Sequence, residues 1–186
     1  MRLDHIAYRV KDRHETANFF GSCLGYKIGS EFQIEFDDGS TADCLALVPP
    51  EGRHPDTSMW EYNALMGTSG APGTVRANFH APPEIFVSDG AKGSIVGDWV
   101  IEKNGIGGVH HIAYQVDNVE KMMSEWKERG YAEFLSDEPM QCPGLKQVFT
   151  KPSKLTGVIY ELISRTGKGF CEDNVKGLME STKELS

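Results

Sequence analysis

An internal repeat constrains the fold of this chain more than any other feature. Leu3–Val10 reads LDHIAYRV and Val109–Val116 reads VHHIAYQV, so the two stretches share His, Ile, Ala, Tyr and the final Val. Self-similarity of this kind is typical of a duplicated supersecondary unit. Short β-prone runs with alternating side chains also predict strands. The sequence therefore predicts two copies of one module, each of which opens with a strand.

A similar order of elements follows each copy of the repeat. Amphipathic stretches at Arg13–Leu24 and Val119–Arg129 predict helices, and each is followed by a Gly-Tyr pair. Glycine just past a helix is a common C-terminal stop. Strand-like runs separated by turn residues come next. These runs are 27–36, 41–48 and 75–87 in the first module, and 131–136, 145–150 and 158–163 in the second.

The predicted fold class is α+β, with two βαβββ modules paired about a pseudo-twofold axis into a U-shaped mixed sheet. Each module has an apolar sheet face that needs a partner, and pairing the modules buries both faces. We expect a single domain over residues 1–186 with a cleft between the modules. Its expected parts are module one (1–90, with an insertion at about 49–73), module two (107–165) and a C-terminal helix (about 172–183). The insertion is rich in Pro and Gly, although 60–66 could form a further strand.

Three residues of this arrangement are candidate metal ligands. His5 and His111 hold equivalent positions in the two opening strands, so they are expected to meet across the cleft. Glu161 lies in an apolar strand, where a buried carboxylate needs a cation or hydrogen bonds. Two histidines and one carboxylate leave open coordination positions, which suits Fe(II), although Mn, Ni, Co or Zn also accept these ligands. The alternatives are structural histidines and a Glu161 whose carboxylate reaches water.

Two further positions depend on the same strand register. Glu84 ends the first module much as Glu161 ends the second, so we expect either a fourth ligand or base, or a surface residue. Since side chains alternate along a strand, His110 and Asp4 are expected to point away from the face that carries His111 and His5.

Charge and composition exclude several classes of protein. A net charge of -8 argues against a nucleic-acid-binding surface and favours a small-molecule substrate. No apolar run is long enough to span a membrane, and Met1 is not followed by a leader-like pattern, so we expect a cytoplasmic protein. The four cysteines form no CxxC pair and are expected to be reduced structural thiols.

These residues resemble the vicinal-oxygen-chelate superfamily over most of the chain. Segments 107–118, 146–152 and 157–162 are similar to methylmalonyl-CoA epimerases and glyoxalases. Segments 147–152, 160–163 and 169–180 resemble the catalytic half of 4-hydroxyphenylpyruvate dioxygenase, including its iron-ligand Glu and closing helix. The resemblance implies a C-terminal helix over the cleft, a homodimer as one possible assembly, and His110, Phe149 and Phe170 as substrate-binding residues.

The resemblance leaves three hypotheses for function. The first is Fe(II)- and O2-dependent oxidation of a small chelating substrate such as a 2-oxo acid. The second is a non-redox isomerase of the glyoxalase or epimerase type that works through an enediolate, with Glu84 bound to the metal. In this case Asp43 or Cys44 stands where the epimerases have a catalytic Glu. The third hypothesis is a metal-free protein that binds a small molecule.

Overall fold

The computed structural model describes residues 1–49, 83–166 and 170–183, which form one mixed sheet with helices on both sides. The sheet has eight strands in the order β2-β3-β4-β1-β5-β8-β7-β6. The strands are β1 Arg2–Val10, β2 Lys27–Glu35, β3 Thr41–Val48, β4 Glu84–Asp89, β5 Gly107–Gln115, β6 Met140–Cys142, β7 Leu145–Phe149 and β8 Ile159–Arg165. The helices are α1 Arg13–Leu24, α4 Ile95–Glu102, α5 Val119–Glu128 and α6 Glu172–Ser181. None of these helices has the length and hydropathy needed to cross a membrane.

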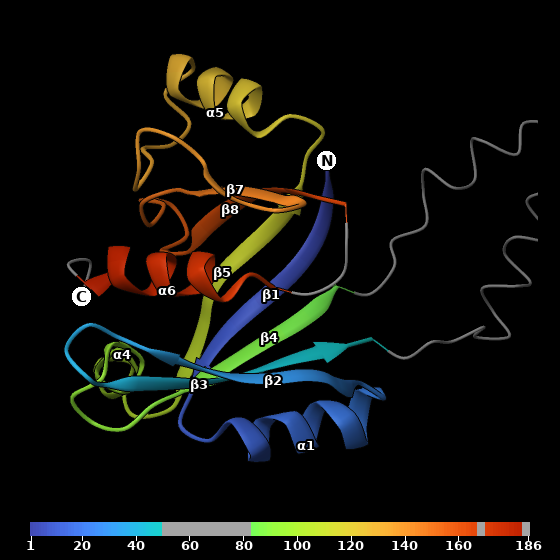
Figure 1. Cartoon of the computed structure of the whole chain (residues 1–186), viewed down its shortest axis with the longest axis vertical. Coiled ribbons are helices and arrows are strands. Elements are labelled where there is room, and N and C mark those ends of the chain that lie inside the picture. Colours follow the sequence, from blue (N-terminus) through green and yellow to red (C-terminus); the bar gives the residue numbers. More distant parts are fainter. Residues whose placement is uncertain (50–82, 167–169, 184–186) are drawn as a thin grey trace, which may run out of the picture.

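The two halves of the sheet repeat the same topology around its centre. Strands β1 and β5 pair antiparallel in the middle, and each has a parallel neighbour, β4 for β1 and β8 for β5. Figure 1 shows the sheet curled, with α1 and α5 on its outer sides and α6 between its two arms. The predicted α+β fold with two βαβββ modules and a C-terminal helix is therefore confirmed.

Each module has its own core between a helix and the outer face of the sheet. Ala17 and Phe20 of α1 are buried in a cluster with Leu45, Leu47 and Ile85. Full burial of one such apolar side chain stabilises a fold by roughly 1.5–3 kcal/mol. The equivalent cluster under α5 contains Val116, Val119, Met123, Phe134, Val148 and Leu162. Each of the two helices therefore packs against the sheet of its own module.

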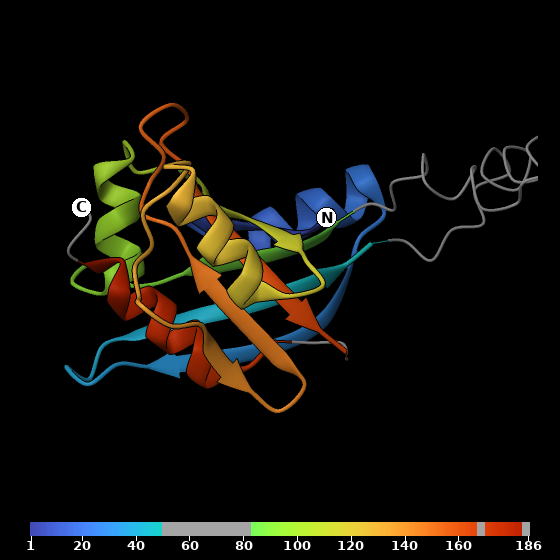
Figure 2. The same cartoon turned by 90° about the horizontal axis from the view of Figure 1, so that it is seen from above.

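The inner face of the curled sheet is covered by α6. Val175 and Met179 pack with Phe86 in the first half, while Leu178 packs with Phe149 in the second half. Figure 2 shows the same arrangement from above, with α6 beside α4. A single short helix thus contacts both modules and closes the concave side of the sheet.

Three expectations about local structure need correction or lie outside the description. Segment 131–136 forms only an isolated bridge, Phe134 with Thr150, and the strand of this region is β6. A run of bends follows this bridge. Helix α4 was not expected, although Ser94 caps it by accepting a hydrogen bond from the Gly97 amide. The expected insertion and strand material at 50–82 lie outside the described residues.

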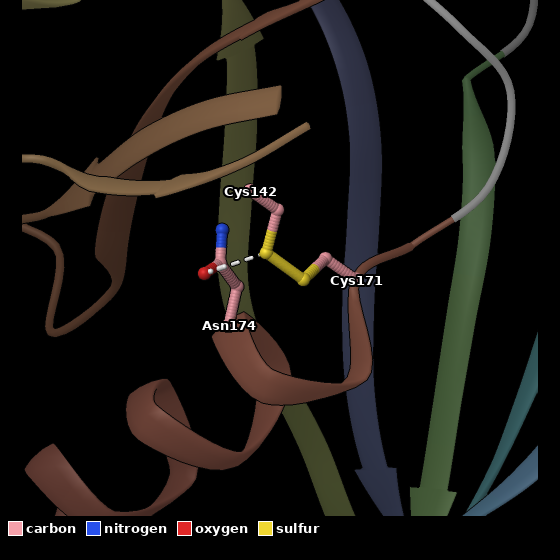
Figure 3. Close-up of a disulfide and its surroundings, with 3 residues drawn as sticks. All are labelled: Cys142, Cys171 and Asn174. Carbon is pink, nitrogen blue, oxygen red and sulfur yellow. Dashed lines mark hydrogen bonds between the residues drawn. A yellow bond between two sulfur atoms is a disulfide. The ribbon is translucent and has the colours of Figure 1, made fainter. Parts of the chain in front are cut away.

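The expectation of reduced cysteines is wrong for one pair. Cys142 of β6 and Cys171, which directly precedes α6, form a disulfide although they are 29 residues apart in sequence. Figure 3 shows this bond together with Asn174, whose side-chain oxygen lies 3.1 Å from the Cys142 sulfur. Because folding brings the edge strand and α6 together, sequence spacing gave no sign of this pairing. Cys23 and Cys44 are free thiols.

Candidate metal centre

His5, His111 and Glu161 converge inside the concave face of the sheet. The His5 and His111 Nε2 atoms are 3.3 Å apart, and Glu161 Oε2 lies 3.2 Å from the first and 3.4 Å from the second. Ligand atoms that share a metal at about 2.1 Å are separated by roughly 3 to 3.5 Å. The three side chains are buried, and each offers one donor atom to the same point.

The carboxylate of Glu161 supports the presence of a cation at this point. Its residue is 1% exposed, and its Oε1 atom has no hydrogen-bond partner. A buried carboxylate with one oxygen left without a partner is costly, and a divalent cation bound at Oε2 would offset part of that cost. The donor set of two imidazoles and one carboxylate therefore fits a divalent transition metal.

Two irregularities of the central strand pair determine what surrounds the histidines. In the pairing of β1 with β5, Leu3 opposes Tyr114 and His5 opposes Ala113, which leaves Asp4 as an extra residue. The register shifts again between Ala7 and Tyr8, where His110 is the extra residue. An extra residue of this kind is a β-bulge, which re-aims side chains. Each bulge residue therefore directly precedes a candidate ligand.

The bulges overturn the expectation that Asp4 and His110 point away from the site. Asp4 Oδ1 accepts a hydrogen bond from His5 Nδ1 at 2.8 Å, and His110 Nδ1 lies 3.0 Å from His111 Nδ1. Simple alternation failed because it assumes an unbroken ladder. A partner on the second ring nitrogen fixes the orientation of a ligand histidine. Asp4 therefore orients the Nε2 atom of His5 toward the metal centre, and His110 does the same for His111.

The protonation states follow from burial and neighbouring charges. Burial alone would lower the pKa of His5, but the charge of Glu161 and the bond to Asp4 outweigh it and raise this pKa to about 9. Burial also opposes ionisation of Glu161, yet the two histidines lower its pKa to about 2. The pKa of His111 is lowered, mainly by burial. Without a metal, the site therefore holds a His5–Glu161 ion pair beside a neutral His111.

Glu84 does not join this group. It opposes His5 in the pairing of β1 with β4, and its Oε2 atom lies 2.8 Å from Arg165 Nη2. The same guanidinium nitrogen lies 2.9 Å from Asp4 Oδ1. Glu84 is thus linked to His5 only through Arg165 and Asp4, and the geometry gives no support to a role as ligand or base.

The register shows why the expected symmetry between Glu84 and Glu161 fails. Glu161 opposes Ala113 of β5, and the equivalent residue of β1, Ala7, opposes Phe86. Phe86 therefore stands at the position that corresponds to Glu161. A phenyl ring does not offer a donor atom of this kind. The described part of the chain therefore supplies three donors, one each from β1, β5 and β8.

The expected substrate-binding residues lie around the same point. His110, Phe149 and Phe170 line one cavity with the three candidate ligands. The Phe170 ring packs edge-on against His5 at 5.0 Å, and the Phe149 ring packs against His111 at 5.5 Å. The cavity measures about 20 Å³, room for little more than one water molecule. A substrate of several non-hydrogen atoms therefore needs more room than this cavity offers.

Sequence reasoning missed Arg9, which also lines the cavity and is 2% exposed. Arg9 follows His5 by four positions and so shares its strand face, which is the signal that could have found it. The repeat offers a second signal. Arg9 corresponds to Gln115, whereas most of the other repeated positions are identical, so this position differs between the two modules.

Comparisons with known proteins identify two epimerases of similar sequence. An ethylmalonyl-CoA/methylmalonyl-CoA epimerase of Cereibacter sphaeroides is 27% identical over 87% of this chain and 96% of its own length. The mitochondrial methylmalonyl-CoA epimerase of Bos taurus is 30% identical over 87% of this chain and 73% of its own length.

Two solved structures show the same fold. A methylmalonyl-CoA epimerase matches with a TM-score of 0.61 and 21% identity over 90% of this chain and 97% of its own. A mutant of 4-hydroxymandelate synthase from Streptomyces coelicolor matches with a TM-score of 0.71 and 18% identity over 99% of this chain and 54% of its own. A family model also matches residues 4–146. The chain belongs to the Glyoxalase/Bleomycin resistance protein/Dioxygenase superfamily.

Proposed function

We propose that this chain is a metal-dependent enzyme whose His5, His111 and Glu161 hold one divalent cation. The observation that carries the proposal is the convergence of three buried donors on one point, with Glu161 Oε1 left without a partner. When bound, the cation would act as a Lewis acid for a substrate with two neighbouring oxygens, stabilising an enolate that forms beside its carbonyl. The protein would contribute geometry and a cavity from which water is excluded.

The reaction we propose is proton transfer beside a carbonyl, as in an epimerase, because the two sequence relatives above carry that name. Of the described residues that line the cavity, Glu161 is the only carboxylate. With Oε2 toward the cation, its unpartnered Oε1 is free to accept the proton. Burial and nearby acidic groups raise the pKa of Cys44 to about 12, which excludes this thiol as a base.

Asp43 is also a poor candidate for the base. Its carboxylate accepts a hydrogen bond from Gln33 and lies 3.5 Å from Arg13. It is absent from the residues that line the cavity. The two residues that could have replaced the catalytic Glu of the epimerases therefore do not serve, and Glu161 is the carboxylate of the described cavity lining that we propose as the base.

One observation favours oxidation by Fe(II) and O2 as a second candidate. Phe86 occupies the position equivalent to Glu161, so the three donors found among the described residues leave the other coordination positions open. This arrangement is typical of Fe(II) oxygenases. Phe86, Phe149 and Phe170 also give the cavity apolar walls, which would protect a reactive oxidant from water.

Two parallel assays distinguish these reactions. Protein loaded with Co(II) or Mn(II) is incubated with methylmalonyl-CoA in D2O, and exchange of the proton beside the carbonyl is followed by NMR. Protein loaded with Fe(II) is incubated with 2-oxo acids in an oxygen electrode. Exchange that is lost in Glu161→Gln supports the isomerase, whereas substrate-dependent oxygen uptake supports the oxygenase. If neither proton exchange nor oxygen uptake is detected, the proposal of an enzyme acting on these substrates is contradicted.

A further inference from the structure

Arg9 is a buried cation in the cavity without a counterion among the described residues. Its Nη2 atom donates a hydrogen bond to Thr182 Oγ1 at 3.0 Å, and its Cζ atom lies 5.7 Å from the centre of the Trp99 ring. No carboxylate of the described residues forms an ion pair with its guanidinium. A guanidinium has five N–H donors, so the hydrogen bond to Thr182 leaves most of them available to a ligand.

Burial of such a group has a cost that the fold offsets only in part. The pKa of Arg9 is lowered to about 9, chiefly by burial. Thr182 caps the C-terminus of α6, and the negative end of a helix dipole favours a nearby cation. A helix end is equivalent to about half a charge, so it does not balance a whole guanidinium. The remaining charge is available to a ligand.

The charges around the cavity indicate what that ligand carries. Among the described residues that line it, Arg9 and Glu161 are the only Arg, Lys, Asp or Glu side chains. With a divalent cation at the metal centre and both ligand histidines neutral, the cation and the described residues that line the cavity carry a net charge of +2. Since an unbalanced charge in a buried site is costly, a substrate with two negative groups fits better than a neutral one.

Arg9 lies on the His110 side of the metal centre. The rings of His110 and His111 are 5.2 Å apart, and Trp99, which lies beneath Arg9, is 5.6 Å from His110. A strand advances about 3.3 Å per residue, so the backbones of Arg9 and His5 are roughly 13 Å apart. A molecule that reaches both the metal and the guanidinium therefore spans several bonds.

We propose that Arg9 binds a carboxylate at one end of the substrate while the other end, with two neighbouring oxygens, lies at the metal. The planar guanidinium matches a carboxylate through two parallel hydrogen bonds. This inference rests on the proposed metal site for one end of the molecule. It makes Arg9 a residue that determines specificity for dicarboxylates.

The test compares ligands that differ only at the far end. Oxaloacetate and 4-methyl-2-oxopentanoate share a 2-oxo acid head and differ in a carboxylate against an isopropyl group of similar shape. 2-Oxoglutarate and 5-methyl-2-oxohexanoate form the same pair with one more carbon. Dissociation constants are measured by calorimetry on the Co(II)-loaded full chain for the wild type, Arg9→Met and Arg9→Lys. Arg2→Gln, which removes an exposed arginine of the same strand, is the charge control.

In the wild type we expect the dicarboxylate of at least one pair to bind roughly tenfold to hundredfold more tightly, the usual effect of a charge-assisted hydrogen bond. Arg9→Met should abolish this preference, Arg9→Lys should keep part of it, and Arg2→Gln should leave it unchanged. Equal binding within both pairs in the wild type would overturn the inference, and this comparison needs no variant to fold. A preference that survives in Arg9→Met would also overturn it and leave Arg9 as a partner of α6 only.

The metal-free protein separates this inference from the proposed function. Succinate and glutarate are titrated into metal-free wild type and Arg9→Met, with butanoate as the monoanionic control. One outcome is that the metal-free protein binds the dicarboxylates only when Arg9 is present, while the affinity for 2-oxo acids does not change when Co(II) is added. This outcome would support the anion site and contradict the metal site. Dependence on Co(II) without dependence on Arg9 would do the reverse.

Discussion

The metal centre predicts that cation binding stabilises the fold through Glu161. A ligand that binds only the folded state adds RT ln(1 + [L]/Kd), which is about 2.7 kcal/mol when the free metal is at 100 times its Kd. For a protein of this length, 1 kcal/mol shifts the melting temperature by roughly 2–4 °C. We therefore expect Co(II) or Zn(II) to raise the melting temperature of the wild type by about 5–11 °C.

The perturbation is Glu161→Gln, which keeps the shape of the side chain but removes its charge. In this variant the metal-induced rise should fall to about 2 °C or less, because one of three donors becomes a weak ligand. The control is Glu84→Gln, which removes a nearby carboxylate that bonds to Arg165 and not to the metal centre. Differential scanning fluorimetry with and without metal gives the shift within each protein, so any effect of the substitution itself cancels. A full shift in Glu161→Gln, or its loss in Glu84→Gln alone, would refute the assignment of ligands.

Other predictions test the surroundings of the centre. The pKa of His5 is raised from an ordinary 6.5 to about 9, so the metal-free fold should lose stability as the pH rises from 6.5 to 9, measured by urea unfolding. Glu161→Gln should show a smaller slope, because only the contribution of Asp4 remains. Asp4→Asn should weaken metal binding roughly tenfold to hundredfold in calorimetry, the usual effect of losing a partner behind a ligand histidine. Reduction of the Cys142–Cys171 disulfide should increase hydrogen exchange in the first turn of α6, and unchanged exchange would show that packing alone holds the helix.

The repeated strand carried most of the correct predictions. It placed His5 and His111 at equivalent positions, and the structure pairs their strands at the centre of the sheet. Helix ends were also visible, since Gly25 has a φ of 77° at the C-cap of α1. These features depend on local residue preferences and on symmetry between the modules, both of which the sequence contains.

Features that depend on tertiary contacts were not predictable in this way. The bulges at Asp4 and His110 arise from how two strands pair, and periodicity within one strand does not reveal them. The disulfide needs the approach of α6 to β6. Sequence reasoning placed Glu84 at the position equivalent to Glu161 because both residues lie near the end of their modules. The pairing of the strands differs, since Phe86 and not Glu84 opposes Ala7.

The expected cytoplasmic location, the single-domain boundaries and the homodimer stay predictions. Disulfides are more typical of proteins in oxidising compartments, so the bond between Cys142 and Cys171 gives the cytoplasmic location no support.

Anomalous diffraction from crystals grown with Co(II) or Mn(II) tests the metal centre most directly. We predict one strong anomalous peak about 2.0–2.3 Å from the Nε2 atoms of His5 and His111 and from a carboxylate oxygen of Glu161. The donors already lie 3.2 to 3.4 Å from one another, so only small side-chain movements are needed. A protein that binds the cation at another place, or shows no peak between these residues at saturating metal, would contradict the account.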